Sequence, residues 1–322
     1  MTTEYPQAGQ PVVTALLAVD EQLPACLASL PLRVARHPAE LRAAITDSEV
    51  LVVWDFRTTL VRDAWPHARR LRWVHAASTG VDPLLFPELV ASDVTVTNAR
   101  GVFDRAIAEY VLGLMLLFAK DLHTTLELQR RRTWRHRETG MLAGRTLLVV
   151  GAGGIGRQVA RLAAGIGMQV SALARTARPG DDDFRHVHGH GDLHAALGEA
   201  DVVVVAVPLT ADTRGLFDAA AFAAMRPGAW LINVARGAVV DEEALLDALR
   251  RGRLAGAGLD VFRDEPLVAD HPFWEMPNVV VSPHMSGDFV GWRETLAEGF
   301  VGNLRRWREG LPLHNIVDKQ VI

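Results

Sequence analysis

Polar residues that can do chemistry follow three apolar segments in the second half of the sequence. Arg236 follows the segment "LINVA", and His284 comes at the end of "VVVSPH". Asp260 and Glu265 lie within and just beyond the segment "GLDVF". Each apolar segment is predicted to be a strand, and ligands of open α/β sheets bind at the carboxyl ends of strands. We therefore expect these side chains to meet at one crevice.

Each of these residues also has an ordinary structural interpretation. Arg236 could form an ion pair at the end of its strand, and Glu265 before Pro266 could stabilise a turn. His284 could be a hydrogen-bonded histidine with no part in a reaction. Three such residues, each at a strand end, favour a functional site over three unrelated structural roles.

A glycine-rich turn in the middle of the chain is typical of dinucleotide binding. Residues 147–164, "LLVVGAGGIGRQVARLAA", place Gly151, Gly153 and Gly156 between an expected strand and an expected helix. The first glycine permits the turn, the second lets the backbone approach a pyrophosphate, and the third lets the helix pack on the strand. The N–H groups at the helix start favour phosphate. We expect the same cofactor site to include Gly154, Ile155 and Arg157.

The residues after the next strand favour NADP(H) over NAD(H). NAD-preferring sites place an Asp or Glu about 20 residues after the turn, where it binds the ribose 2′-hydroxyl. Here the sequence reads "VSALARTARPG", so Arg175, Thr176 and Arg178 precede the first acid, Asp181. A carboxylate would repel the 2′-phosphate of NADP, whereas a guanidinium binds it. The alternative is that both arginines are ordinary surface residues.

Short apolar segments alternate with helical patterns along almost the whole sequence. Runs such as "DVVVVAVP" are apolar on both faces, which is typical of strands covered by helices on both sides. The alternation predicts parallel sheets in an α/β fold. The expected strands are Val12–Val19, Val50–Trp54, Leu71–Ala76, Val94–Asn98, Thr146–Gly151, Gln169–Ala174, Asp201–Val207, Ala229–Val234, Gly256–Val261 and Val279–Ser282.

Residues 178–192 are predicted to be a polar loop. The histidines of this segment, His186, His188 and His190, alternate along the chain and could suggest a metal site. They would share one face only in an extended strand, and the glycines between them argue against a stiff strand. We therefore predict no metal site in this protein.

The composition is that of a folded protein and argues against several functional classes. The chain has 322 residues, 49% of them hydrophobic, and a formal net charge of −4. This length suggests two domains, and the charge gives no reason to expect nucleic acid or an anionic membrane as a partner. The single cysteine, Cys26, fits a reducing cytoplasm. The longest helical apolar run, Tyr110–Ala119, is well short of the ~20 residues of a membrane span.

Several motifs together resemble one known family. The segments "GAGGIGRQVA", "INVARGAVVDEEAL", "GLDVFRDEP" and "VVVSPHMSG", in this order and spacing, resemble the D-isomer-specific 2-hydroxyacid dehydrogenases. "HAASTGVD" and "TNARGVFDRAIAEYVL" resemble the N-terminal motifs of that family, so the likeness covers roughly residues 48–320. The resemblance implies two doubly wound parallel-sheet α/β domains. A Rossmann cofactor domain, residues 98–286, would be inserted into a flavodoxin-like substrate domain, residues 1–97 and 287–322.

The resemblance implies that Arg236, Glu265 and His284 are catalytic. Arg236 would bind the carboxylate of a 2-oxo acid and polarise its C2 oxygen, and His284 would protonate that oxygen as hydride arrives from the nicotinamide. Glu265, hydrogen-bonded to His284, would orient the imidazole and favour its protonated form.

Other residues of the family site can be assigned in the same way. Backbone amides around Ser78, Thr79 and Gly80 would bind the substrate carboxylate. Trp54 could form a wall facing the third carbon of the substrate, or it could be a core residue, and Arg57 could contact an acidic substrate tail instead. Asp260 would hold the nicotinamide carboxamide. We also assign to the cofactor site Val207, Pro208, Thr213, Val234 and Ala235.

The expected function is the reduction of a small 2-oxo acid, such as glyoxylate or hydroxypyruvate, to the D-2-hydroxy acid, with NADPH favoured. Formate dehydrogenases share the fold, but formate oxidation needs no acid–base pair because no oxygen proton moves. A dinucleotide-sensing corepressor could keep the same three residues and is the other alternative. A long helix over Phe103–Arg132 and a basic arm, "LQRRRTWRHRETG", resemble the dimer contact of the family, so we expect a homodimer. The arm could also be a solvated run of charge.

Overall fold

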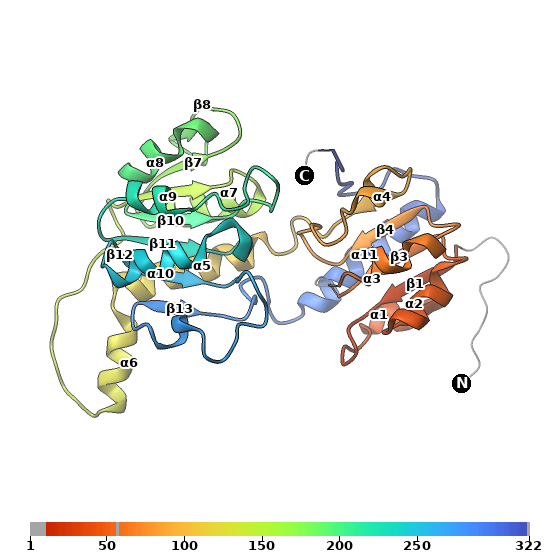
Figure 1. Ribbon diagram of the computed structural model, residues 1–322, viewed down its shortest axis with the longest axis horizontal. Helices are drawn as coiled ribbons and strands as arrows, with labels where there is room; N and C mark the ends of the chain where they lie inside the picture. Colours follow the sequence, from red (N-terminus) through yellow and green to blue (C-terminus); the bar gives the residue numbers. More distant parts are fainter. Residues whose placement is uncertain (1–10, 56–57, 321–322) are drawn as a thin grey trace. The chain divides into compact units, whose positions relative to one another are not determined.

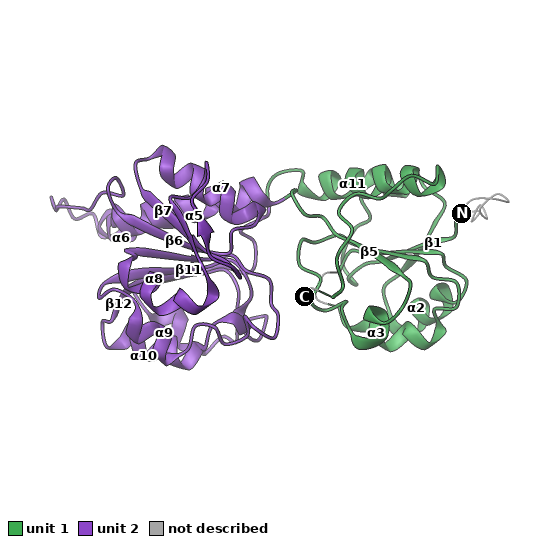
Figure 2. Cartoon of the chain, turned by 90° about the horizontal axis from the view of Figure 1, so that it is seen from above, with its two compact units in different colours: residues 1–102, 289–322 green, residues 103–288 purple. Residues whose placement is uncertain are grey.

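Short runs of buried β-branched residues form the strands of two separate sheets (Figure 1). The computed structural model describes residues 11–55 and 58–320. It divides the chain into two units, which Figure 2 shows in different colours: unit 1 is residues 1–102 with 289–322, and unit 2 is residues 103–288. The predicted domain boundaries fall a few residues from these limits. The backbone N–H groups of Asn98 and Ala99 donate to carbonyls within unit 1, which keeps this segment with that unit.

The sheet of unit 1 has five parallel strands in the order β2-β1-β3-β4-β5. This is the strand order of flavodoxin-like folds. Parallel strands need crossover connections, and helices between them supply the cover on each face. The strands are β1 (Val13–Leu16), β2 (Leu32–Ala35), β3 (Val50–Val53), β4 (Trp73–Ala76) and β5 (Thr95–Thr97).

Helices from distant parts of the sequence cover the two faces of this sheet. Leu41 of α2 (Pro38–Ile45) and Val61 of α3 (Leu60–Ala64) belong to the core on one face. On the other face Trp73 stacks on Phe300 and Trp307 of α11 (Trp292–Arg308). Figure 1 shows the blue α11 beside the orange and red strands of the N-terminal part. The short helices of unit 1 are α1 (Ala25–Ala28), η1 (Trp65–His67) and α4 (Pro87–Val90).

The sheet of unit 2 has eight strands in the order β13-β12-β11-β10-β6-β7-β9-β8. Strands β9-β7-β6-β10-β11-β12 follow the 3-2-1-4-5-6 order of dinucleotide-binding domains. Only the β8–β9 pair is antiparallel among the described strand pairs. The strands are β6 (Thr146–Val150), β7 (Gln169–Leu173), β8 (Arg178–Pro179), β9 (His186–His188), β10 (Val202–Val205), β11 (Ala229–Asn233), β12 (Leu254–Leu259) and β13 (Val279–Val281).

Alternate residues of the central strands enter two different cores. Leu147 and Val149 of β6 belong to the core formed with α5 and α7, and Leu148 and Val150 belong to the core formed with α8, α9 and α10. This two-sided burial explains why the strands are apolar at every position. The helices are α5 (Asp104–Ala119), α6 (Leu122–Arg130), α7 (Gly154–Gly165), α8 (Leu193–Glu199), α9 (Ala219–Ala224) and α10 (Glu242–Arg250), with η2 (His190–Asp192), η3 (Gly237–Val239) and η4 (Pro272–Glu275).

The prediction of one long helix over Phe103–Arg132 is wrong. Helix α5 ends at Ala119, and Asp121 adopts a left-handed conformation with φ of 48° before α6 begins. Arg137 holds this break, because its guanidinium donates to both the carboxylate and the carbonyl of Asp121. The first three residues of the predicted arm belong to α6, residues 131–140 form a mostly exposed stretch without helix, and the Trp134 side chain is fully exposed. Within the described residues, no helix combines the length and apolar character that spanning a bilayer requires.

Candidate active site

The glycine-rich turn has the backbone conformation and the close contacts that dinucleotide binding requires. Gly151 has φ of +115°, and a Cβ there would collide with the carbonyl of Ala206 at the end of β10. A Cβ at Gly156 would collide with the carbonyl of Gly151, so the start of α7 lies directly against the turn. Gly153 is exposed and has open space beside it. The residues present therefore fit a pyrophosphate at the N-terminus of α7.

The loop after β10 lies beside this turn. Thr213 closes the loop on itself, because its hydroxyl donates to the carbonyl of Pro208 at 2.6 Å and accepts from the N–H of Thr210. Val207 is half-buried next to Ala206. Val234 and Ala235, which follow the neighbouring strand β11, are buried. These predicted cofactor residues thus follow the carboxyl ends of two neighbouring strands of the sheet.

The arginines after β7 differ in their surroundings. Arg175 and Thr176 are exposed. The Arg178 guanidinium donates to the Asp181 carboxylate at 2.7 Å, and Arg157 of α7 donates to the same carboxylate at 2.9 Å. These two hydrogen bonds hold the pKa of Asp181 well below its ordinary value. Arg157 also pairs with Asp183 at 2.6 Å, so Arg157 and Arg178 belong to a cluster of ion pairs near the end of β7, whereas Arg175 is exposed.

The imidazole of His284 pairs with the carboxylate of Glu265. Their Nδ1 and Oε2 atoms are 2.9 Å apart, and both side chains are mostly buried. The other carboxylate oxygen of Glu265 accepts from the backbone N–H of Phe262 at 3.0 Å, which fixes its orientation. Because an ionised carboxylate only accepts hydrogen bonds, Nδ1 carries a hydrogen and Nε2 is the nitrogen left for proton transfer. The pair can act as an oriented acid or base.

A buried carboxylate holds the backbone around His284. Asp260 is 1% exposed, and its carboxylate accepts from the Ser282 hydroxyl at 2.6 Å and from the N–H groups of Met285 and Ser286 at 2.9 Å. Its own carbonyl accepts from the N–H of His284, whose φ is 56°. The structure therefore shows Asp260 as the anchor of the turn that carries His284. This role could not be predicted from sequence patterns, because the partners of Asp260 lie 22 to 26 residues away along the chain.

The turn of Arg236 packs against the loop that leads to Glu265. Asn233 fixes this turn, since its side chain accepts from the N–H of Ala235 and donates to the carbonyl of Arg236. A Cβ at Gly237 would collide with the backbone of Phe262, so only glycine fits there. Arg236, Glu265 and His284 are thus carried by turns of unit 2 at the carboxyl ends of β11, β12 and β13.

The predicted substrate residues of unit 1 lie at strand ends of its own sheet. Ser78, Thr79 and Gly80 follow β4, and the Ser78 hydroxyl donates to the Gly80 carbonyl. The Thr79 hydroxyl is buried and has no hydrogen-bond partner in the described part of the chain. Trp54 is 3% exposed and hydrogen-bonds to Glu21, which agrees with the interpretation as a core residue. Arg57 lies outside the described residues.

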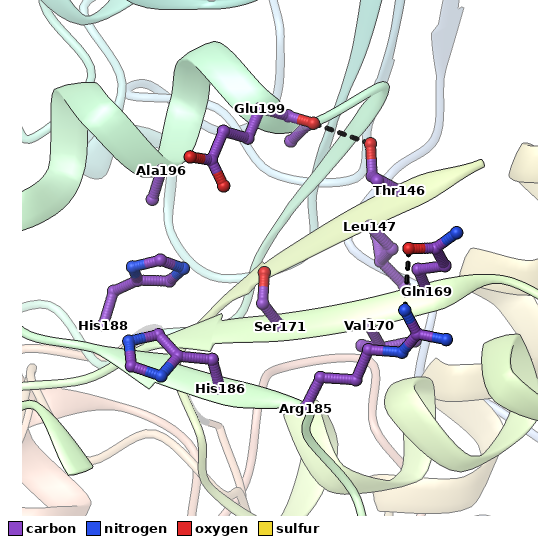
Figure 3. Close-up of a pocket in the computed structure, with 11 residues that line it drawn as sticks. Thr146, Leu147, Gln169, Val170, Ser171, Arg185, His186, His188, Ala196 and Glu199 are labelled. Carbon is purple, nitrogen blue, oxygen red and sulfur yellow. Dashed lines mark hydrogen bonds between the residues drawn. The ribbon is translucent and has the colours of Figure 1, made fainter. Parts of the chain in front are cut away.

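Two of the three alternating histidines form a strand, contrary to the predicted loop. His186 and His188 belong to β9, and Val187 between them is fully buried against the opposite face. Both imidazoles line a cavity of about 310 Å³, and their ring centroids are 4.5 Å apart. Figure 3 shows the two side chains next to each other. Burial, helped by His186, lowers the pKa of His188. Among the described residues, no three side chains are grouped so as to hold a metal ion.

Comparison with known proteins places the chain in a family. A family model for the NAD binding domain of D-isomer specific 2-hydroxyacid dehydrogenases matches residues 112–286. A glyoxylate reductase of Thermococcus gammatolerans is 34% identical over 81% of this chain and 80% of its own length. A glyoxylate/hydroxypyruvate reductase B of Pectobacterium carotovorum is 35% identical over 81% and 83%, respectively.

Solved structures with similar sequences have the same fold. The NADPH-dependent glyoxylate/hydroxypyruvate reductase of Sinorhizobium meliloti, in complex with NADP and sulfate, matches with a TM-score of 0.84 and 30% identity, over 97% of this chain and 99% of that one. A D-isomer specific 2-hydroxyacid dehydrogenase of Xanthobacter autotrophicus, in complex with NADPH and MES, matches with a TM-score of 0.81 and 32% identity, over 97% and 99%. The chain therefore belongs to the D-isomer specific 2-hydroxyacid dehydrogenases, a family of NAD(P)-binding oxidoreductases.

Proposed function

We propose that the protein reduces a small 2-oxo acid, of the size of glyoxylate or hydroxypyruvate, to the D-2-hydroxy acid. The observation that carries this proposal is the 2.9 Å contact between His284 and Glu265. Reduction of a carbonyl to an alcohol requires a proton at the oxygen, and an oriented histidine beside a carboxylate is a suitable donor. The names of the relatives at 34% and 35% identity point to the same class of substrate.

Each residue of the site has a different role in this proposed reaction. A bound NADPH supplies the hydride. Arg236 binds the substrate carboxylate and draws electron density from the C2 oxygen. His284 gives a proton to that oxygen from Nε2, and Glu265 keeps the imidazole oriented and stabilises its charged form. The N–H groups of Thr79 and Gly80 bind the substrate carboxylate through the backbone.

We propose a preference for NADPH over NADH from the charged side chains that follow β7. Arg175 is exposed after β7, and Arg178 lies three residues further along the same stretch. Between the end of β7 and Asp181 the sequence has no acidic residue. The Asp181 carboxylate itself accepts hydrogen bonds from the guanidinium groups of Arg157 and Arg178. A 2′-phosphate would therefore meet a net positive surface. The structures from Sinorhizobium meliloti and Xanthobacter autotrophicus, which contain NADP and NADPH, support the same preference.

A homodimer is proposed for the same enzyme. Four large apolar side chains on and after α6 are at least 43% exposed, and burying them against a second copy would remove this apolar surface from water. Light scattering at the working concentration should give twice the 35.1 kDa mass of the chain, and a mass of one chain would contradict this. The four residues are Leu122, Leu126, Trp134 and Met141.

The decisive experiment for the function is a turnover assay with a panel of substrates. Glyoxylate, hydroxypyruvate, pyruvate and larger 2-oxo acids are each offered with NADPH and with NADH, and the D configuration of the product is checked. We expect the highest kcat/KM with a small 2-oxo acid and NADPH. Oxidation of formate as the main activity would refute the proposal. NADPH binding without turnover of any 2-oxo acid would refute it as well, and would instead indicate a dinucleotide-sensing role.

A further inference from the structure

The loop that carries the proposed carboxylate-binding amides is tied to the segment by which the chain leaves unit 1. The backbone N–H of Ala99 donates to the carbonyl of Ser78 at 2.9 Å. The side-chain amide of Asn98 donates to the carbonyl of Thr79 at 2.7 Å. Two consecutive carbonyls of the loop therefore accept hydrogen bonds from two consecutive residues of the exit segment.

These two hydrogen bonds determine where the amide hydrogens of the loop point. In a trans peptide group the C=O and the N–H point in opposite directions. The Ser78 carbonyl shares its peptide group with the N–H of Thr79, and the Thr79 carbonyl shares its group with the N–H of Gly80. Both N–H groups therefore point away from the donors on Ala99 and Asn98. Within the described residues, neither N–H donates a hydrogen bond to the protein.

A third donor at the same loop also lacks a partner. The hydroxyl of Thr79 is buried from solvent and makes no hydrogen bond with the described residues. Buried polar groups normally have partners, so an orphaned hydroxyl beside two unengaged N–H groups indicates a ligand that accepts hydrogen bonds. An anionic oxygen, such as that of a carboxylate, fits these three donors.

We propose that Asn98 is a positioning residue for the binding of the substrate carboxylate. This inference rests on the proposed function and goes beyond it, because Asn98 acts through the loop rather than by touching substrate. Its side chain is itself held, since its Oδ1 atom accepts from the N–H of Arg100 at 3.3 Å. Its backbone N–H donates to the carbonyl of Asn315, whose side-chain amide donates to the carbonyl of Arg100. The C-terminal segment thus supports the residue that orients the loop.

Removing the donor should weaken substrate binding more than it slows chemistry. Without the Asn98 amide, the peptide group between Thr79 and Gly80 is free to rotate, and the N–H of Gly80 loses its fixed direction. The carboxylate is present in both the substrate and the transition state, so its binding is expressed mainly in KM. Loss of one oriented hydrogen bond to a charged group corresponds to roughly a 10- to 100-fold change.

The test compares two variants of Asn98 with a matched control. Asn98→Asp keeps the shape and the acceptor and removes the donor, and Asn98→Ala removes both. Ser48→Ala is the control, because Ser48 lies in unit 1, is fully buried and bonds to the Thr14 hydroxyl and the Ala44 carbonyl rather than to the loop or the C-terminal segment. KM and kcat for glyoxylate, KM for NADPH, and the Kd of oxalate in the presence of NADP are measured for each protein.

We expect both Asn98 variants to raise the KM for glyoxylate and the Kd for oxalate on the order of 10- to 100-fold. The KM for NADPH and the kcat should change far less. Ser48→Ala should lower the melting temperature and leave the KM for glyoxylate unchanged. Unchanged oxalate affinity in both Asn98 variants would overturn the proposal, and so would an equal rise of KM in Ser48→Ala.

A measurement on the wild-type enzyme covers the case in which the Asn98 variants do not fold. Oxalate should slow hydrogen–deuterium exchange in the peptide that spans residues 78–80, and no slowing would overturn the proposal. This outcome is distinguishable from a failure of the proposed function. An enzyme that turns over no 2-oxo acid but still binds oxalate through Asn98 would refute the function and keep the positioning role.

Discussion

We expect acidification to destabilise unit 1 through one buried histidine. His75 of β4 is 3% exposed, and its Nδ1 lies 2.8 Å from the Thr97 hydroxyl. That hydroxyl accepts a hydrogen bond from the indole N–H of Trp73, so its own hydrogen can be donated to an unprotonated Nδ1. Burial lowers the pKa of His75 from 6.5 to about 4. The folded state is therefore built around the neutral imidazole.

The direction and size of the effect follow from linkage between folding and proton binding. Between pH 6.5 and 4 the unfolded chain binds a proton at His75 and the folded chain does not, so the free energy of unfolding falls as the pH is lowered through this range. The full difference amounts to about 3 kcal/mol, and about 2 kcal/mol of it is lost between pH 7 and pH 5. Above the ordinary pKa of histidine this residue contributes no pH dependence.

The assay is urea denaturation followed by tryptophan fluorescence at several pH values from 7 to 5. Five of the eight tryptophans lie in unit 1, so the signal reports mainly on the unit that contains His75. Between pH 7 and pH 5, the free energy of unfolding of His75→Asn should fall by about 2 kcal/mol less than that of the wild type. His67→Asn replaces an exposed histidine of the same unit and serves as the control. Parallel curves for the wild type and His75→Asn would refute the reasoning.

Four further predictions concern the site in unit 2. His284→Ala should lower kcat by about 10²- to 10⁴-fold while the Kd of NADPH, measured by fluorescence, changes little. Glu265→Gln keeps the shape of the side chain and removes the carboxylate that holds the His284 imidazole, so kcat for reduction should fall with little change in the Kd of NADPH, and a wild-type kcat would contradict the pairing. Arg175→Asp should reverse the ratio of kcat/KM for NADPH and NADH by roughly 10- to 150-fold, whereas equal efficiencies in the wild type would already exclude the preference. Gly156→Ala should abolish NADPH binding, since its Cβ would collide with Gly151, and wild-type affinity would show that the turn can shift.

Hydrophobic patterns in the sequence predicted the strands whose residues are buried on both faces of a sheet. The strands with uninterrupted valines, such as β10, were predicted because burial on both faces leaves no polar position. Strand β2 was missed because it is an edge strand with only Ala35 fully buried, so its pattern does not differ from that of a loop. Strand β9 was missed because it has three residues, two of them polar, and pairs with β7 across some 15 residues.

The parts that sequence reasoning could not predict depend on contacts between distant residues. The break at Asp121 is held by Arg137, which comes sixteen residues later. The pairing of Glu265 with His284 was expected only from the family resemblance, because their 2.9 Å contact depends on how two turns are folded and no local pattern shows it. The role of Asn98 was not predicted, because the type and position of one asparagine do not indicate its partner, the carbonyl of Thr79.

The buried polar residues of unit 2 lie next to two residues of the proposed reaction. Burying a polar side chain costs free energy unless it is hydrogen-bonded, so such residues are rare in cores. In the described part of unit 2, the buried polar residues are Asn233, Asp260, Ser282 and Ser286. Asn233 fixes the turn of Arg236, and the Asp260 carboxylate accepts from the Ser282 hydroxyl and from the backbone N–H of Ser286, on either side of His284. The polar groups buried in this core therefore hold the backbone of the two residues that, in the proposed reaction, bind the substrate and supply its proton. This distribution is expected if the core was shaped to keep those two side chains in place, and it is not expected if Arg236 and His284 were ordinary surface residues.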